Sequence, residues 1–294
     1  MTLDGGSNMR VEPLGEFVGA DIDGIDLSRP LREEEVDFLR YAVSRYGVVR
    51  LRGQQLTDRQ LMAMSGQFGA LDVSPGYAGS GGAAGGEDDE VAKFVAVISN
   101  VVENGKPIGG LGDGEAVWHA DMTYIASPPA MCALYALEVP PSGGRTGFLS
   151  LYHAFDTLPP ALRERAARLQ LKHDATYNSA GEVRRGVVVS DDPRHTPGWV
   201  HPLVATHPRS GRKLLLLGRR RNASIVGLPL DESEELLDRL WEHTARDDAS
   251  WHQTWEVGDV IMWDNVATMH RRDSFPSDTR RVMHRTQILG SALA

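Results

Sequence analysis

The chain contains a single cysteine in 294 residues, so no disulfide bond can form within it. This excludes the small secreted folds that depend on disulfides for their stability. Cys132 lies in the apolar run "MCALYAL", and we expect it to be a small buried core residue. Lysine is also scarce, with four Lys beside 27 Arg, which we attribute to the base composition of the genome.

Long apolar segments are absent as well, since no run approaches the roughly 18 residues that a membrane-spanning helix needs. The start of the chain, "MTLDGGSNMRVEPLG", lacks the cationic and apolar regions of a signal peptide. The formal net charge of −9 argues against nucleic acids and anionic membranes as partners, because both attract basic surfaces. With 41% hydrophobic and 24% charged residues, we predict an ordinary soluble, cytoplasmic protein.

The N-terminal part of the chain predicts alternating helices and strands. Residues 33–47 carry apolar side chains at helical spacing, and Gly47 ends the pattern. The short apolar run at 48–53 predicts a strand. Residues 56–69 predict a second helix, which opens with a capping box formed by Thr57 and Gln60. An α/β region therefore precedes the rest of the chain.

Residues 75–90, "PGYAGSGGAAGGEDDE", are too rich in Gly and Ala to pack against a core, and we expect a flexible loop. Two interpretations of this loop stay open. It is either a passive surface insertion or a lid that orders over a bound substrate.

From residue 91 onward, short apolar runs alternate with turns rich in Gly, Pro and Asn, which is typical of a β-sandwich or barrel. The predicted strands are 93–100, 131–139, 144–152, 213–218, 259–265 and 281–289. Helices are expected at 159–170 and 231–245, the second with Asp231 as its N-cap. We find no internal repeat and no domain boundary. We therefore predict one mainly β domain with flanking helices over residues 1–294.

The segment "WHADMTY" places His119 and Asp121 two residues apart in a predicted strand, where alternate side chains share a face. With ten His and 23 Asp in the chain, such a pair also arises by chance. A metal site of two imidazoles and one carboxylate needs a second histidine from elsewhere. The best candidate is His270, which follows the predicted strand 259–265. Spacing alone leaves rivals open, namely His201, His207, His252 and His284.

Five ordered segments resemble the blocks of the taurine dioxygenase / 2,4-dichlorophenoxyacetate dioxygenase family: "WHADMTY", "GGRTGFLSLYHAFDTLP", "HPLVATHPRSGRKLLLL", "WDNVATMHRRD" and "RRVMHRTQILG". The likeness extends to "YGVVRLRGQQLTDRQLMAMSGQFG" near the start, so it covers nearly the whole chain. Members are iron(II)- and 2-oxoglutarate-dependent oxygenases. The resemblance implies a double-stranded β-helix, a cupin-like jelly roll, in which His119, Asp121 and His270 bind the iron.

The same resemblance implies roles for three further residues. Thr146 matches the position that hydrogen-bonds the cosubstrate, and Arg281 matches the arginine that holds the distal carboxylate of 2-oxoglutarate. Arg285 matches an arginine that faces the acidic group of the substrate. Because Arg281 and Arg285 are an even number of residues apart, they share a face of one strand. Arginine also suits the role, since its planar fork grips a carboxylate with two parallel hydrogen bonds.

The chemistry that the resemblance implies uses Fe(II), 2-oxoglutarate and O2, with ascorbate as an optional reductant, and releases succinate and CO2. Related halogenases carry a small residue at the position of Asp121, so the carboxylate here predicts oxygenation rather than halogenation. We expect hydroxylation, or hydroxylation that triggers cleavage. Desaturation or N–C oxidation by a natural-product tailoring oxygenase is the alternative. A more remote alternative is a non-catalytic jelly roll that only binds a metal or a ligand.

The match to taurine-type members is weaker around the substrate. Glu115 stands where those members carry an asparagine, and a carboxylate there favours an amine and repels a sulfonate. We therefore expect a small acidic or zwitterionic substrate, with its acid group on Arg285 and its amine near Glu115. We also expect Met122 and Tyr124 to line the substrate site, and Tyr77 is a further candidate.

Three features have no role that the resemblance supplies. The run Arg219–Arg221 has no counterpart in taurine-type members, and neither has "YNSAGEVRRGV" at 177–187. We expect Arg271, Arg272 and Arg280 to be solvated. The sequence also leaves the oligomeric state open, with a homodimer and a homotetramer among the alternatives.

Overall fold

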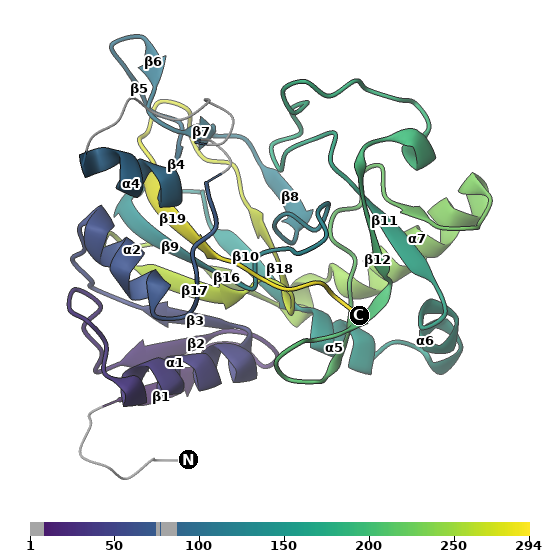
Figure 1. Ribbon diagram of the computed structural model, residues 1–294, viewed down its shortest axis with the longest axis horizontal. Coiled ribbons are helices and arrows are strands. Elements are labelled where there is room, and N and C mark those ends of the chain that lie inside the picture. The colour runs from purple at the N-terminus through teal and green to yellow at the C-terminus, as the bar shows by residue number, and fades with distance from the viewer. Residues whose placement is uncertain (1–8, 75–76, 78–86) are drawn as a thin grey trace.

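Two β-sheets form the centre of the computed structural model, which describes residues 9–74, 77 and 87–294 (Figure 1). The larger sheet has eight strands, in the spatial order β1 (Arg10–Pro13), β2 (Ala20–Asp23), β3 (Val48–Leu51), β17 (Val260–Asp264), β9 (Met131–Glu138), β19 (Val282–Ile288), β4 (Ala96–Ser99) and β7 (Gly110–Leu111). The smaller sheet has four, in the order β16 (Ser250–Gln253), β10 (Thr146–Ser150), β18 (Thr268–Arg272) and β8 (Ala116–His119).

Within these two sheets, all pairs are antiparallel except β2–β3 and β4–β7. Strand β9 shows why the sheets stack. Its residues Cys132, Leu134 and Ala136 are buried with Phe148 of β10 in a core between the sheets. Alternate residues such as Met131 and Ala133 belong to a second core on the outer face. Two facing sheets with flanking helices form the predicted double-stranded β-helix, and this prediction is confirmed.

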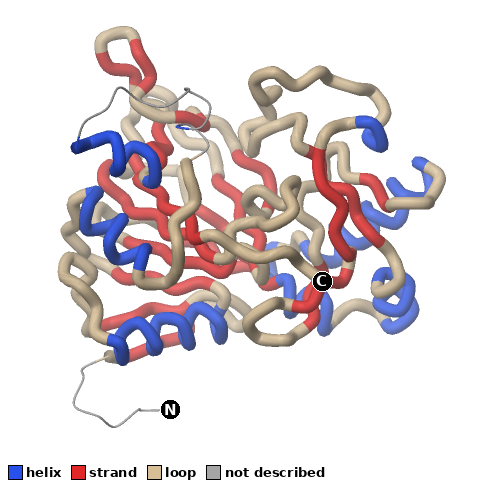
Figure 2. Tube along the Cα trace, in the orientation of Figure 1, coloured by secondary structure: helices blue, strands red, loops and turns tan. Residues whose placement is uncertain are grey.

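The outer face of the larger sheet is covered by helices α1 (Glu33–Tyr46), α2 (Asp58–Gly66) and α4 (Glu87–Phe94) (Figure 2). The capping box of α2 is present as predicted, since Gln60 N–H donates to Thr57 Oγ1 and Gln60 Oε1 accepts from Thr57 N–H. The α/β character of the N-terminal region is therefore confirmed.

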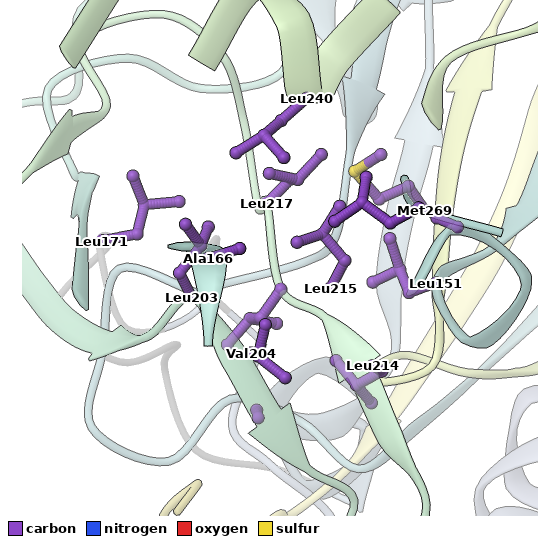
Figure 3. Close-up of a cluster of buried hydrophobic side chains, with 14 of the residues drawn as sticks. Leu151, Ala166, Leu171, Leu203, Val204, Leu214, Leu215, Leu217, Leu240 and Met269 are labelled. Carbon is purple, nitrogen blue, oxygen red and sulfur yellow. The ribbon is translucent and has the colours of Figure 1, made fainter. Parts of the chain in front are cut away.

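A third core lies beside the smaller sheet, under helices α5 (Leu151–Asp156), α6 (Pro160–Ala166) and α7 (Leu230–Thr244) (Figure 3). Short strands complete this region: β11 (Gln170–Asp174), β12 (Gly198–Pro202), β13 (Val204–Thr206), β14 (Lys213–Leu215) and β15 (Ser224–Ile225). The remaining elements are the hairpin β5 (Val102–Glu103) with β6 (Lys106–Pro107), and single 3₁₀ turns at Pro193–His195 and Asp247–Ala249.

Three local predictions need correction. The loop predicted at 75–90 ends earlier, because residues 87–90 begin α4. The strand predicted at 93–100 starts only at Ala96, since Lys93 and Phe94 still belong to that helix. Helix α7 begins at Leu230 with Pro229 as its N-cap, so Asp231 lies in the first turn, where its charge favours the positive end of the helix dipole.

The lid and insertion interpretations of the loop concern mainly residues 75–76 and 78–86, which lie outside the described part of the chain. Among the described helices, none has the length and apolar character needed to cross a membrane.

Candidate active site

The two histidines and the aspartate of the predicted metal site converge at one end of the smaller sheet. His119 is the last residue of β8 and pairs directly with His270 on β18. One ligand atom from each of His119, Asp121 and His270 can be chosen so that all three lie within 4.8 Å of one another. Because β8 ends at His119, Asp121 lies in the turn after the strand, not on the strand as predicted.

The imidazole of His119 is oriented by its own strand. Nδ1 lies 2.7 Å from the backbone carbonyl of Val117, and since a carbonyl only accepts, Nδ1 carries the proton. Nε2 is then left as an acceptor, 3.5 Å from Asp121 Oδ1. An imidazole whose second nitrogen is fixed in this way is the usual form of a histidine metal ligand.

The turn that carries Asp121 is fixed by Asn265, a buried residue between β17 and β18. Its Oδ1 accepts from Asp121 N–H at 2.8 Å, and its Nδ2 donates to the carbonyls of Asp121 and Pro129 at 2.9 and 3.0 Å. The backbone N–H of Ala120 donates to Gly218 O at 3.1 Å. Gly218 has φ +63°, and a Cβ there would lie 2.1 Å from His173 Nδ1, so only glycine fits this approach.

The Asp121 carboxylate has two different oxygens. Oδ2 accepts from Arg285 Nη1 at 2.9 Å and from Gln287 Nε2 at 3.3 Å, while Oδ1 faces His119. Burial by itself would raise the pKa of Asp121, but the charge of Arg285 beside it holds the pKa well below its usual range. The carboxylate is therefore ionised, with Oδ1 directed at His119.

His270 is available as a neutral ligand. Burial, reinforced by the neighbouring His119, lowers the pKa of His270 to about 3. Within the described residues, His270 Nδ1 is buried without a hydrogen-bond partner. A neutral imidazole pair with an ionised carboxylate is the donor set of a facial metal site with open positions.

An inner pocket adjoins the triad and is lined by His119, His270, Thr146, Arg281 and Arg285, among others. Arg281 is 2% exposed and, within the described residues, has no acidic partner within ion-pair distance. Burial lowers the pKa of Arg281 to about 9, so its guanidinium is still charged at neutral pH. Thr146 Oγ1 accepts from Trp255 Nε1 at 2.9 Å, which leaves the hydroxyl proton free to donate into the pocket.

The buried, unpaired guanidinium of Arg281 indicates what kind of molecule the inner pocket suits. A buried charge without a counter-ion is unfavourable, and a carboxylate from a bound molecule would supply one. The donor set of the triad, a free hydroxyl donor and an unpaired guanidinium fit an iron-bound keto acid with a distal carboxylate.

An outer cavity of about 870 Å³ adjoins the triad at Asp121. Asp121, Met122, Tyr124, Arg285 and Tyr77 are among the residues that line it. Arg281 and Arg285 both line the inner pocket, as their even spacing predicted, and Arg285 faces the outer cavity as well. The predicted candidates Met122, Tyr124 and Tyr77 therefore line the same cavity as Asp121.

Two predictions about charged residues are wrong. The Glu115 side chain is 60% exposed and lies 4.0 Å from Arg271, and it does not line either cavity. In a regular strand, Glu115 would share a face with His119, four residues later. The pairing of β8 with β18 shifts in register between Ala116 and His119, and this irregularity turns Glu115 away from the face that carries His119. Arg272 is buried rather than solvated, lines the inner pocket, and donates to the carbonyls of Leu111 and Gly114.

The rival histidines have partners away from the triad. His201 Nε2 bonds the carbonyls of Thr123 and Ile125, and His207 pairs with Asp264. His252 bonds Ser250, and His284 pairs with Asp58.

Sequence reasoning missed several residues that shape the site. Asn265 and Gln287 hold Asp121, Trp255 holds Thr146, and Arg184 and Arg219 line the outer cavity. Asn265 and Gln287 lie inside the family-like segments "WDNVATMHRRD" and "RRVMHRTQILG", which was the one available signal.

A double-stranded β-helix that carries two histidines and one aspartate around open coordination positions defines the class of non-haem metal-dependent oxygenases. The sequence profile of the "Taurine catabolism dioxygenase TauD, TfdA family" matches residues 10–287. The chain belongs to this family of dioxygenases.

Individual relatives match over nearly their full length. Pentalenolactone F synthase from Streptomyces arenae is 30% identical over 290 residues, covering 94% of this chain and 93% of the relative. The alpha-ketoglutarate-dependent 2,4-dichlorophenoxyacetate dioxygenase from Cupriavidus pinatubonensis is 30% identical over 300 residues, covering 96% and 98%. The crystal structure of a taurine dioxygenase from Burkholderia xenovorans superposes with a TM-score of 0.77 at 31% identity, covering 97% of this chain and 91% of that one.

Proposed function

We propose that this chain is an Fe(II)- and 2-oxoglutarate-dependent dioxygenase that hydroxylates a small carboxylate or amino-acid-like substrate, with release of succinate and CO2. One observation carries the proposal. The three ligand atoms of His119, Asp121 and His270 converge within 4.8 Å beside Arg281, a buried arginine that has no acidic partner among the described residues.

In this proposal the residues of the inner pocket bind the cosubstrate, and those of the outer cavity bind the substrate. His119, Asp121 and His270 would hold the iron, which supplies oxygen activation when it is bound. Arg281 and Thr146 would bind the distal carboxylate of 2-oxoglutarate in the inner pocket. This leaves the outer cavity for the substrate, and its walls would exclude water from the reacting C–H bond.

Arg285 would meet the acid group of the substrate. Its Nη1 already donates to Asp121, but its Nε is buried without a partner among the described residues and its side chain reaches the outer cavity. With Glu115 outside both cavities, the residue expected to meet an amine is not at the site. Three arginines, Arg184, Arg219 and Arg285, line the outer cavity, so we propose an acid rather than a zwitterion as the substrate.

A natural-product tailoring oxygenase is the second candidate, and one observation favours it. The outer cavity, at about 870 Å³, lies near the upper end of the usual range for small-molecule sites and exceeds what a taurine-sized substrate requires. A relative named pentalenolactone F synthase is 30% identical.

Three finer predictions accompany the proposal and are untested. They are ascorbate as an optional reductant, a homodimer or homotetramer in solution, and a cytoplasmic location.

The metal-binding part of the proposal is tested by anaerobic absorption spectroscopy. Adding Fe(II) and 2-oxoglutarate should produce a metal-to-ligand charge-transfer band in the unaltered protein. The band should disappear in His119→Ala and in His270→Ala, and it should persist in His252→Ala, which removes a histidine outside the triad. An undiminished band in both ligand variants would refute the assignment.

A further inference from the structure

Two arginines without acidic partners face the outer cavity from segments that the resemblance left without a role. Arg184 belongs to "YNSAGEVRRGV", and Arg219 is the first residue of the run Arg219–Arg221. Arg219 lies close to the metal triad, because its backbone forms a bridge with His119. Its Nη1 donates to Tyr177 O at 2.7 Å, which fixes the side chain along the cavity wall.

The guanidinium of Arg184 is held by the aromatic ring of Tyr124. Its Cζ lies 4.3 Å from the ring centroid, close enough for a cation–π contact. Burial raises the pKa of the Tyr124 hydroxyl, so the phenol stays protonated and can donate a hydrogen bond. Tyr124 therefore adds a neutral donor to the cavity lining beside Arg184.

Neither arginine forms an ion pair within the described residues, and the Nε atoms of both are buried without a partner. Burial lowers the pKa of Arg219, and the nearby charge of Arg184 lowers it further. Two like charges on one wall are unfavourable unless an anion joins them. Arg220 shows the contrast, since it forms ion pairs with Glu234 at 2.6 Å and Asp238 at 2.7 Å.

Among the described residues, no acidic side chain that lines the cavity pairs with Arg184 or Arg219. Asp121 pairs with Arg285 and belongs to the triad, and Asp58 pairs with His284 at 2.5 Å. Glu182 is exposed to solvent and accepts from Asn178 Nδ2 at 2.8 Å. The charge of Arg184 and Arg219 is therefore available to a bound molecule.

The cavity also has an apolar part. Val95, Val97, Ile98, Ile108 and Leu111 line it from β4 and the segments that flank it. A ligand that fills the cavity thus meets aliphatic side chains as well as arginines.

We propose that Arg184 and Arg219, with Tyr124, form a second anion-binding subsite, so that the substrate carries two oxyanion groups joined by an apolar segment. One group contacts Arg285 beside the metal, and the other contacts Arg184 and Arg219. The oxyanion at this second subsite is a carboxylate or a phosphonate-like group, since both suit the guanidinium fork. The inference rests on the proposed function for the position of the reacting end.

Calorimetric titration tests the subsite without turnover. The protein is first saturated with Mn(II) and N-oxalylglycine, an unreactive isostere of 2-oxoglutarate, which fills the inner pocket. It is then titrated with suberate, with octanoate, and with phosphono-octanoate bearing a terminal phosphonate. Suberate and octanoate have the same chain length and differ in one carboxylate. The phosphonate distinguishes a subsite for carboxylates from one for phosphoryl groups.

The variants are Arg184→Gln and Arg219→Gln, with Arg220→Gln as the matched control outside the cavity. We expect each cavity variant to raise the dissociation constant of the doubly anionic probes at least tenfold and to change that of octanoate less than twofold. The control variant should change neither dissociation constant. Unchanged affinity for both doubly anionic probes in both cavity variants would overturn the subsite. An equal loss of affinity for octanoate and suberate would overturn it too, because it would mean that these arginines bind the carboxylate that both probes share.

The charge-transfer band in the same variants separates this inference from the proposed function. If Arg184→Gln and Arg219→Gln retain the band formed with Fe(II) and 2-oxoglutarate, a failure of the titration concerns the subsite alone. A missing band in the unaltered protein would instead contradict the proposed function.

Discussion

At the scale of single residues, neighbouring arginines have opposite environments. Arg280 is 51% exposed and pairs with Glu138 and Glu103, whereas Arg281 is 2% exposed without an acidic partner among the described residues. The two side chains point to opposite faces because they follow one another into β19. Only the inward-facing arginine can serve a buried carboxylate.

Replacing Arg281 with alanine should weaken 2-oxoglutarate binding at least tenfold. Truncating one partner of a buried charge pair costs roughly 2–5 kcal/mol, because the other charge is left unpaired. The dissociation constant is measured by anaerobic titration of the charge-transfer band. Arg280→Ala, the adjacent control, should change it less than twofold. A change below twofold in Arg281→Ala would mean that another residue binds the carboxylate.

At the scale of elements, the site depends on the turn between β17 and β18. This turn carries Asn265, whose side chain bonds the backbone N–H and carbonyl of Asp121 from a segment more than 140 residues away. His270 follows on β18 and pairs with His119 on β8. One turn therefore sets the relation between the two parts of the triad.

Asn265→Ala should lower the stability of the fold by about 3 kcal/mol, because buried backbone groups of Asp121 lose their partners. It should also lower metal affinity roughly 10- to 100-fold, because this is the usual effect of losing a residue that orients a metal ligand. Urea unfolding and Mn(II) titration measure the two effects.

Thr57→Ala is the control for this prediction. It removes the N-cap of α2, away from the triad, and should cost about 1 kcal/mol of stability with unchanged Mn(II) affinity. Equal Mn(II) affinity in Asn265→Ala and the unaltered protein would show that the turn does not position Asp121.

At the scale of the whole molecule, the cores bury a histidine that has no polar partner. His173 on β11 is 1% exposed, and neither ring nitrogen has a hydrogen bond within the described residues. Burial lowers its pKa to about 3. The unfolded value is roughly 6.5, so between these two values the unfolded chain binds the extra proton and the folded protein does not.

The free energy of unfolding should therefore fall as the pH falls from about 6.5 toward 3. Each such histidine contributes a slope of up to about 1.4 kcal/mol per pH unit. His173→Asn should reduce this slope in urea unfolding of the metal-free protein between about pH 6 and 4. His195→Asn, which changes a largely exposed histidine, should leave the slope as it is. An identical slope in the His173 variant would mean that this ring is protonated in the folded state.

The sequence by itself determined the parts of this protein that local patterns encode. Helical spacing and the capping box predicted α1 and α2, and short apolar runs bounded by turns predicted β9 and β17. The ordered family-like segments identified the triad, because its residues stand in recognisable neighbourhoods of sequence.

Tertiary structure alone decided which charged side chains reach the site. Glu115 lies four residues before His119 yet is exposed, while Arg184 and Arg219 come from distant loops and line the outer cavity. The number of residues between two positions does not predict how close they lie in space, because the register of the sheets and the path of the loops determine that distance. Burial decides charge pairing in the same way, so the unpaired arginines became visible only once the fold had placed every carboxylate.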